Sequence, residues 1–241
     1  MHFYIQPRIL YTLNKLVNCL ISSFLKSPRL DRKPSFLLLF IQHSPLNPNI
    51  GLETMNDVVF RQGENVILRP FERRDIPILR KWVNDPEITQ FLLASLPQME
   101  KQEEEWFDGL HKRPNDFVLG IVEKKENKLI GSIGLHGVNW LSRTASTGTM
   151  IGEKEYWSKG YGTEAKMLLL DFAFNTLDLY GIQSRVLDFN GRSLKYANKC
   201  GYEKVATIPN WIRRNGKRCD EIILIVTQEK WQPLWKEFIK K

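Results

Sequence analysis

Gly160 and Gly162 stand just before a long apolar segment, and Lys159 precedes them. Glycine allows the backbone to approach a ligand closely and to present its N–H groups. N–H groups at a helix start, together with the positive end of the helix dipole, favour bound phosphate. Residues 157–163 therefore predict a phosphate-binding turn, with a plain strand-to-helix turn as the alternative. The spacing excludes a Walker loop, which needs Gly-Lys-Ser/Thr, and a dinucleotide fingerprint, which needs a third glycine.

The elements around this turn have to be a strand before it and a helix after it. Residues 143–151 predict the strand. A helix is predicted over about residues 160–177, because apolar residues recur there at steps of three and four and make one buried face. These residues are Ala165, Leu168, Leu169, Phe172 and Ala173. The helix makes a crossover, so the strand predicted over 182–189 should pair in parallel with its predecessor.

A second segment, residues 185–202, reads as a strand, a break at Asn190, a short helix and a glycine-aromatic step into another strand. In this order the two segments resemble the acetyl-CoA-dependent N-acetyltransferases of the GNAT superfamily. Residues 157–162 (Trp-Ser-Lys-Gly-Tyr-Gly) stand where that family has its Gln/Arg-x-x-Gly-x-Gly/Ala pyrophosphate loop. Residues 188–202 resemble its second signature, an Asn followed by a Tyr and by Cys-Gly-Phe. The resemblance extends over about residues 66–231 and is nearest to the ribosomal-protein alanine acetyltransferases and the spermidine acetyltransferases.

The resemblance implies a set of site residues for acetyl-CoA, the acetyl donor. Backbone N–H groups of the turn would hold the pyrophosphate, and the end of the preceding strand would pair with the pantetheine arm. The expected cofactor-binding residues are Met150, Ile151, Trp157, Lys159, Gly160, Tyr161, Gly162, Thr163, Asn190 and Ser193. Tyr196 stands where the family carries a Tyr that protonates the coenzyme A sulfur, so it is the expected catalytic general acid. A packing tyrosine is the alternative for this residue.

The general base does not carry over from the family. Arg185 stands where some protein N-terminal acetyltransferases have a Glu, and Ala145-Ser146 where many relatives have Ala-Glu. A water chain or a groove carboxylate such as Glu103 remains a candidate. The missing base leaves open a catalytically inactive acetyl-CoA-binding sensor. It also slightly favours an α-amino acceptor, whose pKa near 8 lies below the value of about 10.4 for a lysine amine.

Other residues are assigned no chemistry from the sequence. His111 and His136 lie outside the two motifs and are interpreted as surface or packing residues. Trp140, Trp211 and Trp231 could line a groove, but core packing is the default for large aromatic side chains.

Two charged segments bear on the acceptor. Residues 85–116 carry eight acids and three bases. A solvated helix face is the simpler interpretation. The resemblance places a wall of the acceptor groove here, and an acidic wall would attract a cationic amine. The basic segment 210–220 would repel a free polyamine if it lined the groove, so we expect a protein or peptide amine, with a polyamine or other small amine as the alternative.

The remaining pattern completes an α+β domain. Strands are predicted over 65–70, 117–122 and 129–135, and a hairpin over 202–226 turns at Asn215-Gly216. Helices are predicted over 75–83, over 98–112 with Met99, Trp106 and Leu110 on the apolar side, and over 231–239. As the resemblance implies, the sheet should be mixed and mostly antiparallel, flanked by helices, with a parallel strand pair splayed around the acetyl-CoA site.

Composition sets further bounds. The 241-residue chain carries a net charge of +8, of which residues 1–54 contribute six bases and two acids. The remaining excess does not by itself indicate nucleic acid. Three widely spaced cysteines give neither a disulfide framework nor a zinc pattern, so we expect no metal and a reducing, cytoplasmic location. The resemblance leaves room for a homodimer.

The first 54 residues differ from the rest. Their apolar runs are shorter than the roughly 18–20 residues that span a bilayer, so no stable membrane span is expected. Several prolines interrupt the segment. The preferred interpretation is a loose extension, or a translation start assigned too early, ahead of an N-acetyltransferase domain over 55–241. A signal peptide or a membrane-binding amphipathic helix over about 4–26 is the alternative.

Overall fold

The computed structural model describes residues 58–93 and 96–240. The chain divides into two units, Met1–Met55 and Asn56–Lys241. The expected N-terminal extension, with the amphipathic helix considered for it, lies outside the described residues. All described residues belong to the second unit.

Eight strands of the described residues form one sheet in the order β1-β2-β3-β4-β5-β6-β8-β7. One neighbouring pair within it, β5 and β6, is parallel, and the other pairs are antiparallel. This is the mixed, mostly antiparallel sheet that the sequence predicts. The strands are β1 (Arg61–Gln62), β2 (Val66–Pro70), β3 (Phe117–Glu123), β4 (Lys128–Asn139), β5 (Thr144–Ile151), β6 (Gly181–Leu187), β7 (Glu203–Arg214) and β8 (Lys217–Thr227).

The two hairpins form at the polar turns that the sequence indicates. Asn127 between β3 and β4, and Asn215 between β7 and β8, have φ of 50° and 48°. Asparagine tolerates this left-handed region better than most residues. Strand β4 runs to Asn139, four residues beyond the predicted end at Leu135. The extra length brings His136 into the sheet opposite Ser146.

The parallel pair separates after four residue pairs. Strands β5 and β6 pair from Thr144 and Gly181 to Thr147 and Ser184. Beyond that point β5 stays paired with β4, and β6 stays paired with β8. The two strands therefore diverge, and their backbones face each other across an opening at the carboxyl end of the pair, as expected for a splayed pair.

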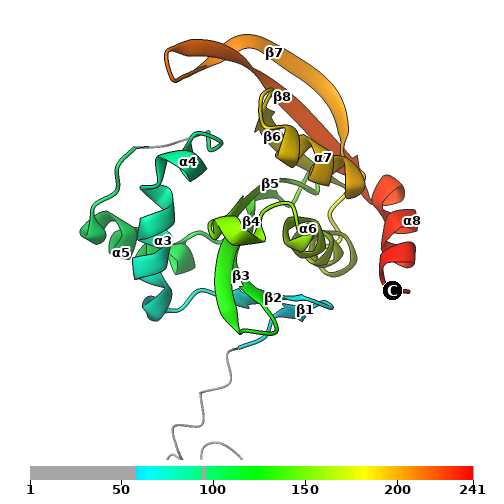
Figure 1. Ribbon diagram of the computed structural model, residues 1–241. Helices are drawn as coiled ribbons and strands as arrows, with labels where there is room; N and C mark the ends of the chain where they lie inside the picture. The colour runs from blue at the N-terminus through cyan, green and yellow to red at the C-terminus, as the bar shows by residue number, and fades with distance from the viewer. Residues whose placement is uncertain (1–57, 94–95, 241) are drawn as a thin grey trace, which may run out of the picture. The chain divides into compact units, whose positions relative to one another are not determined.

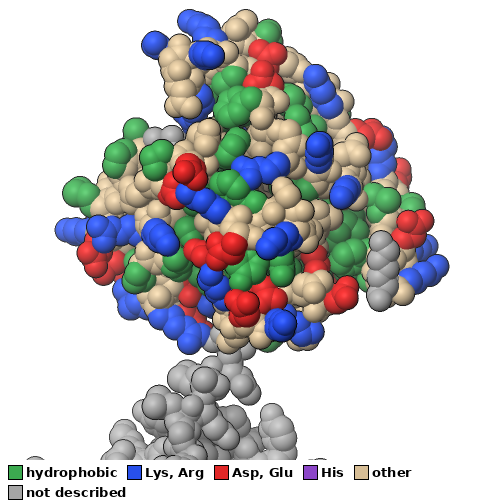
Figure 2. All heavy atoms as spheres, viewed as in Figure 1, with side chains coloured by type: hydrophobic (Ala, Val, Ile, Leu, Met, Phe, Trp, Pro, Cys, Tyr) green, Lys and Arg blue, Asp and Glu red, His purple; other side chains and the backbone are tan. Residues whose placement is uncertain are grey.

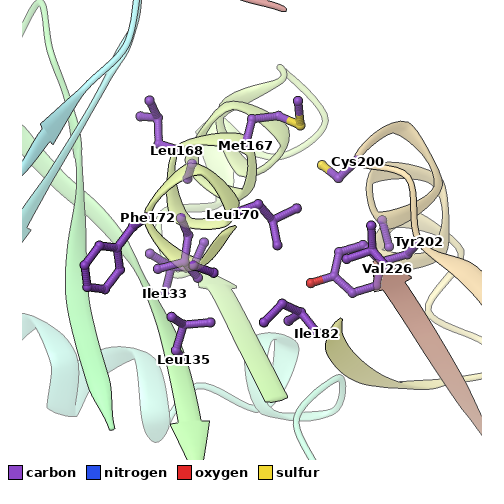
Figure 3. Close-up of a cluster of buried hydrophobic side chains, with 14 of the residues drawn as sticks. Ile133, Leu135, Met167, Leu168, Leu170, Phe172, Ile182, Cys200, Tyr202 and Val226 are labelled. Atoms are coloured by element: carbon purple, nitrogen blue, oxygen red, sulfur yellow. The ribbon is translucent and has the colours of Figure 1, made fainter. Parts of the chain in front are cut away.

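Helix α6 (Tyr161–Asp171) crosses from β5 to β6 and packs on the sheet. Figure 3 shows Leu170 of this helix pointing toward Ile182 of β6, and Ile133 of β4 belongs to the same buried core. The single long helix predicted from the sequence changes to a π-helical turn, η4 (Phe172–Thr176). Two more helices, α7 (Gly191–Lys199) and α8 (Gln228–Phe238), lie on the same side of the molecule (Figure 1).

Three helices before β3 form a separate small core. They are α3 (Ile76–Val83), α4 (Pro86–Thr89) and α5 (Glu100–Gly109), and the buried cluster between them contains Leu79 and Trp82. Trp106 packs against this cluster, as predicted, but Met99 is 68% exposed. The prediction for Met99 was wrong because this residue precedes the helix with extended backbone. Short 3₁₀ turns complete the fold: η1 (Arg73–Asp75), η2 (Leu110–Lys112) and η3 (Lys154–Tyr156).

Two negative findings apply to the described residues. None of their helices has both the length and the apolar composition needed to cross a membrane. Their His, Cys, Asp and Glu side chains form no group that could hold a metal ion.

Candidate active site

The turn between β5 and α6 has the backbone of an anion site. Ser158 and Gly160 both take positive φ, 61° and 97°. Gly160 is the N-cap of α6, and only glycine adopts a φ near 97° without strain. Left-handed residues next to residues of negative φ can turn neighbouring backbone N–H groups toward one point, and the helix dipole adds positive potential there. The first N–H groups of α6, those of Tyr161 and Gly162, are placed for a phosphate. That of Thr163 instead donates to the Gly160 carbonyl at 2.9 Å.

The Trp157 side chain connects this turn to strand β5 by a hydrogen bond. Its indole Nε1 donates to the Ile151 carbonyl oxygen at 2.7 Å. The guanidinium of Arg192, from the start of α7, lies 3.8 Å from the centre of the Trp157 ring and 5.0 Å from that of Phe91. A guanidinium over an aromatic face is held by the ring quadrupole. Arg192 is therefore positioned beside the turn, although neither sequence motif pointed to it.

A cleft of about 590 Å³ opens between the diverging strands and this turn. Nine of the residues predicted from the sequence line it, while Lys159 and Tyr161 are not among the lining residues. The nine are Met150, Ile151, Trp157, Gly160, Gly162, Thr163, Asn190, Ser193 and Tyr196. The tyrosine ring of position 161 instead packs edge-on against Tyr156, with 5.2 Å between ring centres. Helix α7 adds Lys195 and Lys199, so the cleft combines helix-start N–H groups with cationic side chains, which suits a polyphosphate.

Tyr196 and Asn190 come from the strand-break-helix segment after β6. Asn190 caps α7, because its Oδ1 accepts from the Ser193 N–H at 3.1 Å. Its amide oxygen is thus committed to the helix, and the NH₂ group is the part that could bind a pantetheine arm. Burial raises the pKa of Tyr196, since the phenolate would be poorly solvated, while the side chains of Thr149 and Ser193 act in the opposite direction. The hydroxyl therefore stays protonated at neutral pH and can serve as an acid.

A buried lysine lies beneath Tyr196. Lys166 on α6 is 1% exposed, and its Nζ lies 6.0 Å from the centre of the Tyr196 ring and 5.7 Å from that of Tyr202. This Nζ has no hydrogen-bond partner within the described part of the chain. Burial lowers the pKa of Lys166 to about 7. The neighbouring thiol of Cys200 is also buried, which raises its pKa to about 12 and makes it a poor nucleophile.

A second cavity, of about 460 Å³, adjoins the cleft. Leu92, Gly148, Thr149 and Met150 line both. Its other walls are mainly apolar and come from α3, the segment before α5, α5, β3 and β4. They comprise Leu79, Val83, Leu96, Gln98, Glu103, Trp106, Val118, Ser132, Ile133, Gly134 and His136.

Glu103 is the carboxylate among these lining residues, and it is 6% exposed. Burial raises its pKa, because a charged carboxylate loses solvation there. A cationic amine next to it would restore the favourable environment for the charge. This agrees with the acidic wall considered for residues 85–116, although most acids of that segment lie outside the cavity lining.

His136 also lines this cavity, and 42% of its side chain is exposed, which is compatible with the surface position expected from the sequence. The residue lies on the part of β4 that the sequence did not predict as strand. Among the tryptophans, Trp106 lines the cavity, whereas Trp231 is fully buried in the core. Trp140 and Trp211 are 51% and 62% exposed and line neither opening.

Arg185, which stands at the position of the family's Glu, forms an ion pair with Glu221 of β8 at 2.5 Å. The Glu221 side chain is fully buried.

The β7–β8 hairpin contacts the segment after α4. Arg214 Nη2 donates to the carbonyl oxygens of Leu92 and Leu93 at 2.6 and 2.7 Å. Figure 2 shows Lys and Arg side chains at the tip of this hairpin, which is at the top of the view. The hairpin's bases are absent from the lining of both openings. They therefore supply no argument against a polyamine.

Comparisons with known proteins agree with this geometry. The family model of the acetyltransferase (GNAT) domain matches residues 65–203. The uncharacterised N-acetyltransferase p20 of Bacillus licheniformis is 26% identical over 162 residues, which are 65% of this chain and 89% of that protein. Human alpha/beta-tubulin-N-acetyltransferase 9 is 26% identical over 167 residues, 64% of this chain and 79% of that protein.

Among solved structures, a spermidine N-acetyltransferase from Vibrio cholerae, in complex with CoA and spermine, superposes with a TM-score of 0.66. It is 21% identical, and the match covers 70% of this chain and 99% of that one. At this sequence identity the match supports the assignment of the fold and does not indicate the substrate of this chain. Since the family model covers more than half of the chain, this protein belongs to the acetyltransferase (GNAT) domain family and is an N-acetyltransferase that uses acetyl-CoA.

Proposed function

We propose that this N-acetyltransferase transfers the acetyl group of acetyl-CoA to the α-amino group of a protein or peptide whose first side chain is apolar. The observation that carries the proposal is the make-up of the second cavity. One carboxylate, Glu103, stands among its otherwise mainly apolar walls, within the described lining. We take this cavity as the acceptor site, because it meets the cofactor cleft at Thr149 and Met150.

The charge pattern of the cavity supports a single amine. A polyamine carries a positive charge every few bonds, so its binding site needs several acceptors along its length. Burying its other ammonium groups against leucines and a tryptophan would cost solvation energy without compensation. A peptide N-terminus carries one ammonium group beside a side chain, and an apolar side chain gains from burial against such walls.

Residues of the chain have defined roles in this reaction. The N–H groups at the start of α6, with Arg192 beside them, bind the pyrophosphate. Acetyl-CoA supplies the thioester whose acetyl group is transferred. Tyr196 and Thr149 both line the cleft. The Tyr196 hydroxyl protonates the departing sulfur, and this protonation prevents the thiolate from attacking the product and reversing the transfer. Oriented backbone N–H groups of the diverging strand end near Met150 can stabilise the carbonyl oxygen as charge develops on it.

A competition assay tests the acceptor class. Peptides with free N-termini, differing only in an apolar, acidic or basic first residue, are mixed with spermidine and acetyl-CoA, and products are identified by mass spectrometry. We expect acetylation at the α-amino group, fastest for the apolar first residue. Acetylation of spermidine alone would overturn the proposal in favour of the polyamine alternative. No product from peptides, polyamines or small amines would favour an acetyl-CoA-binding sensor.

We also propose a cytoplasmic location. Within the described residues Cys200 and Cys219 are free thiols, in keeping with a reducing compartment. Mass spectrometry of the purified protein without reductant tests this, because a disulfide involving either residue would contradict it.

A further inference from the structure

The floor of the acceptor cavity is a pair of glycines. Gly134 of β4 and Gly148 of β5 lie opposite each other in the sheet. The imidazole of His136 lies across them: a Cβ on Gly134 would sit 3.0 Å from its Nε2, and a Cβ on Gly148 would sit 3.5 Å from it. A Cβ on Gly134 would crowd the ring, whereas a Cβ on Gly148 would make an ordinary van der Waals contact with it. The absence of a side chain at Gly134 thus gives the imidazole room to lie over the two strands.

This orientation brings Nε2 toward the point where the two openings meet. Gly148, beneath Nε2, lines both the cofactor cleft and the acceptor cavity, and so do the next two residues along β5, Thr149 and Met150. The acceptor nitrogen has to reach the thioester at this junction. His136 is therefore placed on the acceptor side of the reacting atoms.

Asp116 lies near the other ring nitrogen, beyond hydrogen-bond distance. Its Oδ2 lies 4.0 Å from His136 Nδ1, and its Oδ1 accepts from the Gly137 N–H at 2.8 Å. The carboxylate favours the tautomer with the proton on Nδ1, which leaves the Nε2 lone pair facing the cavity. The carboxylate thus acts on the imidazole through its charge and not through a direct hydrogen bond.

Burial, more than the surrounding charges, favours the neutral imidazole of His136. Burial lowers the pKa of His136, Asp116 raises it, and Lys166 and Arg113 lower it further. Glu103 of α5 lines the same cavity. A neutral imidazole can take a proton from an ammonium group, which a protonated one cannot.

We propose that His136 is the general base of the acetyl transfer and that Asp116 is its positioning residue. The proposal rests on the proposed function, because the amine has to enter this cavity. His136 Nε2 takes one proton from the ammonium group, and the freed lone pair attacks the thioester carbonyl. The C–N bond forms and the C–S bond breaks. The sulfur takes a proton from Tyr196, which regains one from the amide nitrogen, and the proton on His136 leaves to solvent.

The test compares His136→Gln with the control His111→Gln, since His111 is an exposed histidine outside both openings. We expect His136→Gln to lower kcat about 100- to 1,000-fold. The affinity for acetyl-CoA and the melting temperature should match those of the control.

The pH profile separates a base from a structural residue. In the wild-type protein log kcat/KM should fall at low pH as His136 is protonated. In His136→Gln this limb should disappear, and the residual rate should rise with pH until the acceptor amine itself loses its proton. Asp116→Asn should lower kcat about tenfold and move the limb to lower pH, because the carboxylate that raises the pKa of His136 is gone. A kcat for His136→Gln within about threefold of the wild type, with an unchanged limb, would overturn the proposal.

A chemical-modification experiment on the wild-type protein tests the role of His136 even if the His136→Gln variant does not fold. Diethyl pyrocarbonate modifies neutral imidazoles, and peptide mapping distinguishes His136 from His111. We expect activity to be lost in step with His136 modification, and acceptor peptide to protect it. Full activity with His136 fully modified would overturn the proposal. Each assay uses whichever amine the wild type acetylates fastest, so a polyamine result would refute the proposed acceptor class and still decide the role of His136.

Discussion

The cofactor cleft and the acceptor cavity share the end of β5 but are built differently. The cleft consists largely of backbone: the left-handed turn at Gly160, the start of α6 and the edges of two separating strands. The cavity consists of side chains from α3, α5, β3, β4 and β5. A backbone site requires a local sequence with glycines at fixed places, whereas a side-chain site can be assembled from residues far apart in the chain. The cofactor cleft can therefore be recognised from a sequence motif, whereas the acceptor cavity cannot.

The two regions also differ in charge. Arg192, Lys195 and Lys199 line the cleft, whereas the acceptor cavity holds the buried Glu103 and the neutral His136. The cationic walls suit the phosphates of the donor, and the carboxylate suits an ammonium group. The difference implies that variants in one region should affect one substrate and leave the binding of the other unchanged.

Substitution of Gly160 should give the largest loss of acetyl-CoA affinity, and it tests whether the cofactor cleft depends on backbone conformation. Gly160→Asp places a carboxylate in the turn and forces an L side chain into a φ of 97°. We expect acetyl-CoA affinity to fall more than about 100-fold by calorimetry, since the strain and the repulsion of phosphate act together.

Alanine substitutions at the two glycines divide this effect into its parts. Gly160→Ala should lose about tenfold through strain alone, at about 1–2 kcal/mol. A Cβ on Gly162 would meet Ile151 at an ordinary 3.8 Å. Gly162→Ala should therefore bind acetyl-CoA within a few-fold of the wild type. Equal losses at both positions would show that space in the cleft, and not backbone conformation, is what the glycines supply.

Tyr196→Phe should lower kcat about 10- to 100-fold with little change in either KM, because proton donation to the sulfur matters only as the bond breaks. The control is Tyr180→Phe, since Tyr180 is exposed and lines neither opening. Steady-state thiol release measures both. An unchanged kcat would assign Tyr196 to packing and leave water as the proton donor.

Glu103→Gln should act on the acceptor alone. We expect the acceptor KM to rise about five- to tenfold while the acetyl-CoA KM stays constant, because a buried ion pair with the ammonium is lost. In the wild type the acceptor KM should also rise as pH falls through the raised pKa of Glu103. The neighbouring Glu104 is exposed, so Glu104→Gln is the matched control. An increase in the acetyl-CoA KM instead would contradict the separation of the two regions.

Removal of residues 1–54 should have the smallest effect. The sheet, both openings and every residue given a role above belong to the unit Asn56–Lys241. We expect a protein starting at Met55 to match the full chain in melting temperature and in kcat with the same peptide. A large drop in melting temperature on truncation would show that the extension packs on the domain.

The sequence predicted the parts of this molecule that local rules determine. Apolar runs separated by polar turns located the strands and the two hairpins, one of them at Asn215-Gly216, and the glycine turn located the cleft. The acceptor cavity was not predictable, because Glu103 and His136 meet only through the packing of α5 and the register of β4 on β5. Arg192 was missed for a similar reason, since its place beside Trp157 depends on how α7 packs against the turn.

Lys166 makes unfolding a proton-consuming process. Its pKa is about 7 in the folded protein and about 10.4 when exposed, so between these values the unfolded chain binds more protons than the native one. The contribution of Lys166 to the free energy of unfolding therefore rises with pH from about 7 toward 10.4 and is constant below that window. Calorimetric unfolding at pH 8.5 should show an enthalpy that depends on the ionisation heat of the buffer. In Lys166→Met this part of the buffer dependence should vanish. The number of protons taken up on unfolding would then measure whether Lys166 is buried in the core.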